Sequence, residues 1–91
     1  MPTFTTKRRK AREALRKCIF DHTGRQISGS GFAQKPMSSW DMELFKWEEI
    51  LECCENNLAS PYNVQLNHLD ARATHNVTLS ATITHIAGKM D

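Results

Sequence analysis

Seven cationic side chains are concentrated in residues 7–17, a density that no other part of the chain shares. They are Lys7, Arg8, Arg9, Lys10, Arg12, Arg16 and Lys17. Arginine and lysine in such a cluster neutralise closely spaced phosphates and release the counterions of a polyanion. Like charges one helical turn apart also destabilise a helix, so the cluster costs free energy unless an anionic partner offsets it. The segment therefore predicts an anion-binding surface.

Three interpretations of this basic segment stay open. Nucleic acid is the favoured partner, with RNA slightly preferred to DNA, and Arg25 and Lys35 would extend its footprint. Because the segment offers almost no Asn or Gln to recognise base edges, we expect contacts with the sugar-phosphate backbone. The second interpretation is an acidic protein surface or the acidic helix of the same chain, and the third is a solvated face without a partner. Residues 7–10 (KRRK) also match a short basic nuclear-import pattern.

The formal net charge of +2 conceals a strong asymmetry along the chain. Nine basic and two acidic residues lie before Met37, whereas three basic and eight acidic residues lie from Met37 onward. Glu52 and Glu55 fall near the end of a predicted helix, where the helix dipole disfavours negative charge. A cationic helix alongside would offset that charge. We therefore expect the basic segment either to contact this helix within one chain or to contact it in a second copy.

Other kinds of chemistry have less support. Cys18, Cys53 and Cys54 are an odd number without framework spacing, which predicts free thiols in a reducing compartment rather than a disulfide scaffold. The chain has no zinc-finger spacing, glycine-rich phosphate loop, nucleophile elbow or His-Glu-x-x-His motif. We therefore expect no metal, no cofactor and no enzymatic activity. No apolar run suggests a membrane span or a secretion signal, so a nuclear or cytoplasmic, non-secreted protein is expected.

Two amphipathic helices are predicted to position these residues. After a flexible arm at 1–5, apolar residues at helical spacing predict a basic helix over 6–20 with the arginines on its opposite face. Residues 21–24 follow as a tight hairpin or as a helix stop followed by one strand, and residues 28–37 form a flexible Gly/Ser/Pro linker. Residues 38–58 predict the second helix, capped by Ser38.

The second helix is apolar on two arcs. Its main stripe is more typical of a core surface than of a base-stacking platform, and Met42, Phe45 and Cys53 occupy a different arc. Two apolar arcs suggest that the sheet covers one and a second subunit covers the other. We therefore expect a homodimer. The main stripe consists of Trp40, Leu44, Trp47, Leu51, Cys54 and Leu58, widened on one side by Ile50. Its candidate interaction residues are Trp40, Leu44, Trp47 and Leu51.

After Pro61 the apolar period changes from helical to alternating. Residues 62–66 and 77–83 each alternate apolar with polar side chains, which predicts a pair of half-buried antiparallel strands within 62–86, joined by a turn or short crossover. The expected fold class is α+β, a single domain over 1–91 with its helices packed on one face of a small sheet.

The expected function is that of a small, non-enzymatic nucleic-acid-binding homodimer, of the kind found among viral accessory proteins and silencing suppressors. The alternative is a protein–protein interaction adaptor. In that case the Trp/Leu stripe or the acidic face docks a partner, and the basic segment is an import signal or an intramolecular latch.

Overall fold

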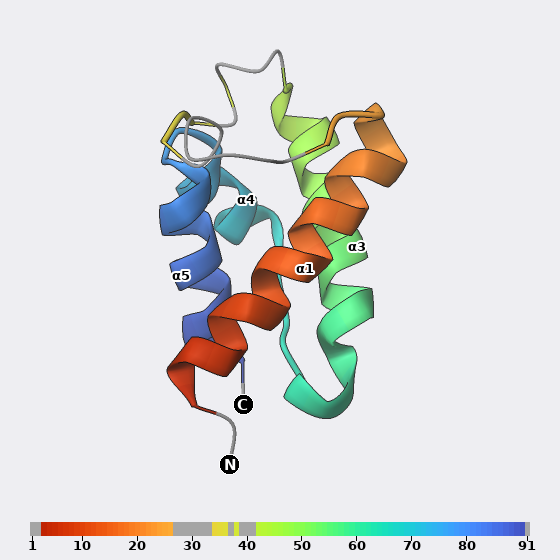
Figure 1. Cartoon of the computed structure of the whole chain (residues 1–91). Coiled ribbons are helices and arrows are strands. Elements are labelled where there is room, and N and C mark those ends of the chain that lie inside the picture. The colour runs from red at the N-terminus through yellow and green to blue at the C-terminus, as the bar shows by residue number, and fades with distance from the viewer. Residues whose placement is uncertain (1–2, 27–33, 37, 39–41, 91) are drawn as a thin grey trace.

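The fold is built of helices packed on one another. The computed structural model describes residues 3–26, 34–36, 38 and 42–90. Within them the helices are α1 (Phe4–Thr23), α3 (Leu44–Tyr62), α4 (His68–His75) and α5 (Leu79–Lys89). α1 lies across α3 and α5, and α4 packs against the same two helices (Figure 1). The predicted α+β class is wrong, because the described residues form no sheet and only an isolated bridge between Pro36 and Thr78.

α1 contains the whole of the expected basic helix and is longer at both ends. Thr3 caps its start by accepting a hydrogen bond from the Thr6 amide at 3.1 Å, so residues 3–5 belong to the helix and its cap rather than to a flexible arm. Gly24 ends the helix in the left-handed region (φ 75°), and its N–H donates to the Phe20 carbonyl at 2.8 Å. Glycine adopts this conformation without a Cβ clash. The helix stop is therefore the correct alternative for residues 21–24, and the hairpin is wrong.

α3 begins later than the predicted helix 38–58. Its first residue is Leu44, preceded by Glu43 as an N-cap without a side-chain hydrogen bond, so Ser38 is not the cap. Trp40 and most of the linker lie outside the described residues. The expected stripe nevertheless faces the core. Its buried members are Trp47, Ile50, Leu51, Cys54 and Leu58.

The connection between α3 and α4 accounts for part of the strand prediction. Tyr62, Val64 and Leu66 are buried while Gln65 is exposed, so the alternation of burial is real. No strand pairs with this segment in the described part of the chain; instead the Leu66 amide donates to the Glu55 carboxylate at 2.5 Å. Alternating burial here marks an irregular connection that packs on the core.

Residues 68–86 form helices where a turn and a second strand were expected. Asn67 and Asp70 make a reciprocal capping box at the start of α4, and Thr78 caps α5 by accepting from the Ala81 amide at 3.1 Å. The buried residues of α5 recur at a helical period: Leu79, Thr82, Ile83, Ile86 and Ala87. The predicted strand pair is therefore wrong. The short apolar run fits both periods, and the helix cap and the packing of α5 on α1 favour the helix.

Two polar networks join the helices, one buried and one centred on the buried Asp70 with partly exposed partners. The fully buried Trp47 donates its indole N–H to the Thr74 hydroxyl at 2.8 Å, and that hydroxyl donates to the Asp70 carbonyl at 2.7 Å. The Asp70 carboxylate accepts from Lys89 at 2.5 Å and from His85 at 2.9 Å, which joins α4 to the end of α5. Burial by itself raises the pKa of Asp70, but these contacts and a backbone hydrogen bond outweigh it and lower the pKa to about 2.

Candidate nucleic-acid interface

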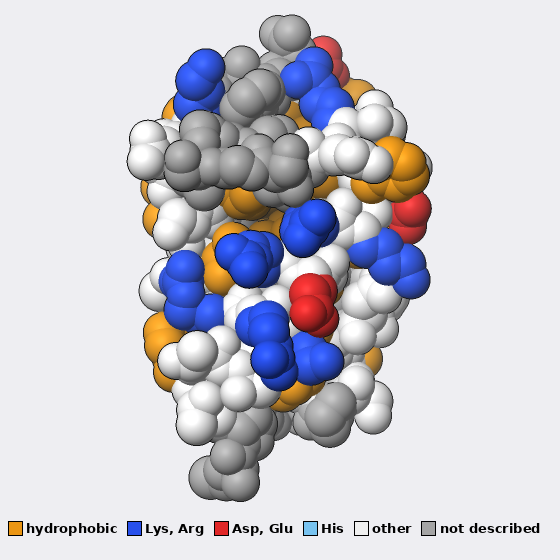
Figure 2. Space-filling view, viewed as in Figure 1, with side chains coloured by type: hydrophobic (Ala, Val, Ile, Leu, Met, Phe, Trp, Pro, Cys, Tyr) orange, Lys and Arg blue, Asp and Glu red, His pale blue; other side chains and the backbone are white. Residues whose placement is uncertain are grey.

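The packing of α1 leaves a broad cationic surface turned toward solvent. The side of the helix that meets the core is small and apolar, consisting of Ala11, Ala14, Leu15, Cys18 and Ile19. Arg9, Arg12, Arg16 and Lys17 are exposed on or beside the opposite side, Lys10 beside them is half-buried, and Lys7 and Arg8 are half-buried at the edges of the core-facing side. Lys and Arg side chains gather over α1 on the face shown in Figure 2. These seven residues are called the α1 basic face below.

Three arginines of the α1 basic face lie on the side of α5. Arg8 donates a hydrogen bond to the hydroxyl of Thr84 in α5. A surface groove of about 350 Å³ runs along this side. It is lined by Thr5, Arg8, Arg9, Arg12 and Ile83. Guanidinium groups form paired hydrogen bonds with phosphate oxygens. The groove therefore has the charge and the donors to bind a phosphate group.

Two lysines of the α1 basic face border α3. Lys10 and Lys17 line a second depression together with Asn57 and Leu58 of α3. Lys10 also lies 3.9 Å from the carboxylate of Glu13, the acidic residue within the basic segment. An exposed pair of this kind contributes little and is screened by salt. The segment therefore keeps a strongly positive surface, with guanidinium groups on one side and ammonium groups on the other.

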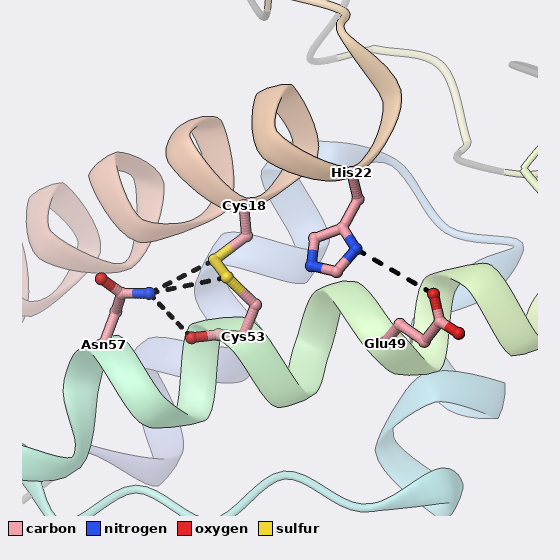
Figure 3. The surroundings of a disulfide bond; sticks show 5 residues. All are labelled: Cys18, His22, Glu49, Cys53 and Asn57. Carbon is pink, nitrogen blue, oxygen red and sulfur yellow. Dashed lines mark hydrogen bonds and ion pairs between the residues drawn. A yellow bond between two sulfur atoms is a disulfide. The ribbon is translucent and has the colours of Figure 1, made fainter.

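A disulfide and two polar contacts hold the C-terminal half of α1 against α3 (Figure 3). The Cys18 and Cys53 sulfurs are bonded at 2.18 Å, and their Cα atoms are 5.8 Å apart. The Asn57 amide donates to the Cys18 sulfur at 3.5 Å, and the His22 ring lies 4.0 Å from the Glu49 carboxylate. The prediction of free thiols is wrong for this pair, because packing brings together cysteines 35 residues apart. The cross-link makes α1 part of a fixed scaffold.

Cys54 is the remaining thiol, and it is fully buried on the core side of α3. Burial raises the pKa of Cys54 to about 12, so the thiol stays protonated at neutral pH and is a poor nucleophile. Across residues 3–26, 34–36, 38 and 42–90 there is no group of three His, Cys, Asp or Glu side chains that could hold a metal ion.

The acidic side chains of α3 do not cover the α1 basic face. Glu48, Glu52 and Glu55 line a separate groove with residues 66–68. Among the described residues, the ion pair between α1 and an α3 carboxylate is that of His22 with Glu49, at the far end of α1 from most of the cations. No lysine or arginine of α1 pairs with α3 in the part of the chain that the structure describes. The expected contact between the basic helix and the acidic helix is thus made within one chain, through apolar side chains and the disulfide, and not through Lys or Arg pairs among the described residues.

Arg25 and Lys35, the two predicted extensions of the basic footprint, both lie outside α1. Arg25 is exposed and comes directly after the Gly24 cap. Lys35 is exposed and directly precedes Pro36. The bridge between Pro36 and Thr78 places Pro36 beside the start of α5.

The candidate interaction residues of the second helix lie mainly inside the chain's own core. Trp47 is fully buried, Leu51 is 2% exposed and Leu44 packs against the same core. Trp40 is outside the described residues. Trp47 and Leu51 therefore offer no surface to a second chain in this fold.

The second apolar arc of that helix also finds partners within the chain. Met42 is buried and Cys53 is bonded to α1, whereas Phe45 is 58% exposed. Two of the three residues that suggested a second subunit are thus accounted for by intrachain contacts. Homodimerisation stays a prediction.

Three features near the interface were missed from the sequence. The Arg8–Thr84 contact and the Cys18–Cys53 bond join residues whose proximity depends on the tertiary fold. Phe20 is different, because it lies in the basic helix one turn after the last arginine and is exposed. Its helical position was a signal available in the sequence.

No family model, curated protein or solved structure matches this chain. The interface is therefore inferred from the residues and their geometry alone. Within the described ranges, no helix is both long and apolar enough to cross a membrane.

Proposed function

We propose that this protein binds nucleic acid through the α1 basic face, without enzymatic activity. The cationic side chains contact the sugar-phosphate backbone, and the packed helices α3, α4 and α5 hold α1 in place. Phosphate contacts of this type give affinity and orientation but carry no sequence information. Recognition is accordingly led by charge and shape.

The observation that supports this proposal is the outward placement of the α1 cations on an anchored helix. The core, the disulfide and the contact with Thr84 fix the helix along its length, while Arg9, Arg12 and Arg16 stay exposed. A pre-positioned set of donors loses less conformational entropy on binding than a mobile tail would. Mutual repulsion among the α1 cations destabilises the helix, and the acidic side chains of α3 do not neutralise them. The α1 basic face is therefore suited to an external polyanion.

The test is a fluorescence-anisotropy titration with labelled single-stranded and duplex RNA and DNA at several salt concentrations. With about 4–6 phosphates contacted, log K should fall with log salt at a slope near −4 to −5. Replacing Arg12 and Arg16 by Gln should reduce that slope by about two units and weaken binding to all sequences alike.

A charge-matched control separates the α1 basic face from the net charge of the protein. Lys46→Gln with Arg72→Gln removes the same two charges from α3 and α4, away from this face. That variant should keep the wild-type salt slope. Equal losses in the two double variants, or no binding at low salt by the wild type, would contradict the proposal.

The adaptor alternative is limited by the burial of Trp47 and Leu51. What remains for it is the groove lined by Glu48, Glu52 and Glu55, to which no α1 cation contributes. If the protein is only an adaptor, replacing Arg12 and Arg16 does not change its nucleic-acid binding. The same titration therefore distinguishes the two functions.

A further inference from the structure

An exposed aromatic ring continues the line of arginines on α1. Phe20 is 48% exposed and lies one turn beyond Arg16. At about 100° per residue, Arg9, Arg16 and Phe20 fall within about 40° of one another around the helix axis. Glu13 lies in the same arc, and its carboxylate is 3.9 Å from the Lys10 ammonium, which offsets its charge. At a rise of about 1.5 Å per residue, the ring follows Arg16 by about 6 Å along that axis. The aromatic face is thus placed at the end of a row of phosphate-binding groups.

A second exposed phenylalanine lies in the opposite electrostatic setting. Phe45 of α3 is 58% exposed, and Glu48, Glu49 and Glu52 follow it at helical spacing on the same side. A polyanion is repelled from that surface and attracted to the one around Phe20. Single exposed apolar side chains are common on protein surfaces. The neighbouring charges are what distinguish Phe20 from Phe45.

Phe4, also exposed, lies at the other end of α1 and points about 160° away from Phe20 around the axis. It therefore does not share the line of Arg9 and Arg16. Phe20 is the ring that lies in register with those two guanidinium groups.

We infer that the ligand of the α1 basic face is a single-stranded nucleic acid, one unpaired base of which stacks on Phe20 while Arg9 and Arg16 hold the neighbouring phosphates. This inference rests on the proposed function and specifies its ligand. In a duplex the faces of the bases are already stacked on one another, so an exposed ring gains a stacking partner only from an unpaired base. Arginines that follow a backbone, combined with an aromatic ring that stacks on a base, are the usual elements of single-strand recognition.

The test compares Phe20→Ala, Phe20→Leu and Phe20→Tyr with the matched control Phe45→Ala. Each variant is titrated with labelled single-stranded RNA and DNA of one sequence, with the corresponding duplex, and with an abasic single strand of the same length. Both phenylalanines are exposed, so the variants should keep the fold, and circular dichroism and thermal melting check this. The abasic strand keeps the phosphates and removes the bases, which isolates the stacking contribution.

If a base stacks on Phe20, Phe20→Ala and Phe20→Leu bind the single strand about fivefold or more weakly than the wild type, at an unchanged salt slope. Phe20→Tyr and Phe45→Ala bind like the wild type. Wild type and Phe20→Ala then bind the duplex equally and the abasic strand equally.

The inference is overturned if Phe20→Ala and Phe45→Ala are indistinguishable on a single strand that the wild type binds. It is also overturned if Phe20→Leu binds like the wild type, since an apolar contact without stacking would then suffice. In both cases the proposed function survives with another ligand geometry. Only a wild type that binds none of the probes removes the proposed function itself.

Discussion

The Cys18–Cys53 disulfide allows a quantitative prediction about stability. Cys53→Ala is the appropriate variant, because Cys53 is partly buried whereas Cys18 is fully enclosed in the core. The bond closes a loop with a sequence separation of 35 residues. The loss of chain entropy in the unfolded state for a loop of this length corresponds to about 4 kcal/mol at 25 °C. Since domains of this size are stable by about 5–15 kcal/mol in total, the loss should be a large fraction of the free energy of unfolding.

The assay is urea unfolding followed by tryptophan fluorescence, which reports on the core because Trp47 is fully buried. The wild type and Cys53→Ala are each measured with and without dithiothreitol. Reduction should lower the free energy of unfolding of the wild type by about 4 kcal/mol and leave Cys53→Ala unchanged. The variant without reductant should unfold close to the reduced wild type.

A thiol titration under denaturing, non-reducing conditions completes the experiment. The wild type should show one reactive thiol, that of Cys54, because the other two cysteines are bonded. Three reactive thiols, together with a free energy of unfolding that does not respond to reductant, would refute the reasoning.

Two further predictions concern the polar networks. The pKa of Asp70, lowered to about 2 in the folded protein, gives stability that is present above the ordinary pKa of 3.8 and is lost as the pH falls through 2. Urea unfolding should therefore show that acidification lowers the free energy of unfolding by about 2 kcal/mol through this group. Asp70→Asn leaves Lys89 and His85 without the carboxylate and should lack this decrease. If the free energy of unfolding of Asp70→Asn fell with acidification as much as that of the wild type, the stabilisation would not come from Asp70. Thr74→Val leaves the buried indole N–H of Trp47 without its acceptor and should cost about 1–3 kcal/mol, more than Thr74→Ser, which keeps the hydroxyl. Equal free energies of unfolding for the two Thr74 variants would show that the hydrogen bond is unimportant.

The faces of the first two long helices were predictable from the sequence. Ala11, Leu15 and Ile19 of α1 and Trp47 and Leu51 of α3 recur at a helical period, and all five are buried. This pattern is local, because residues three and four apart on a helix share a face whatever the rest of the fold does. The outward placement of the α1 arginines follows from the same geometry.

The C-terminal part carries local signals for both helix and strand, and its helix starts, the Asn67–Asp70 capping box and the Thr78 cap, were missed. Leu79 and Ile83 fit an alternating period as well as a helical one, and the β-branched residues around them favour a strand. The Thr78 cap and the packing of α5 on α1 together favour the helix, which buries Ile86 and Ala87 as well. Propensity is a weak preference that tertiary packing overrides.

For the candidate site, the sequence by itself determined the charge and the helical face that displays it, since both depend on residues within a few turns of one another. The tertiary structure alone decided what that face is anchored to and what borders it. Arg8 meets Thr84, and Cys18 meets Cys53, across separations that no local pattern encodes. From composition alone, the acidic side chains of α3 could have paired with the α1 basic face. Their placement around Glu55, on another side of α3, results from which stripe of that helix the core buries.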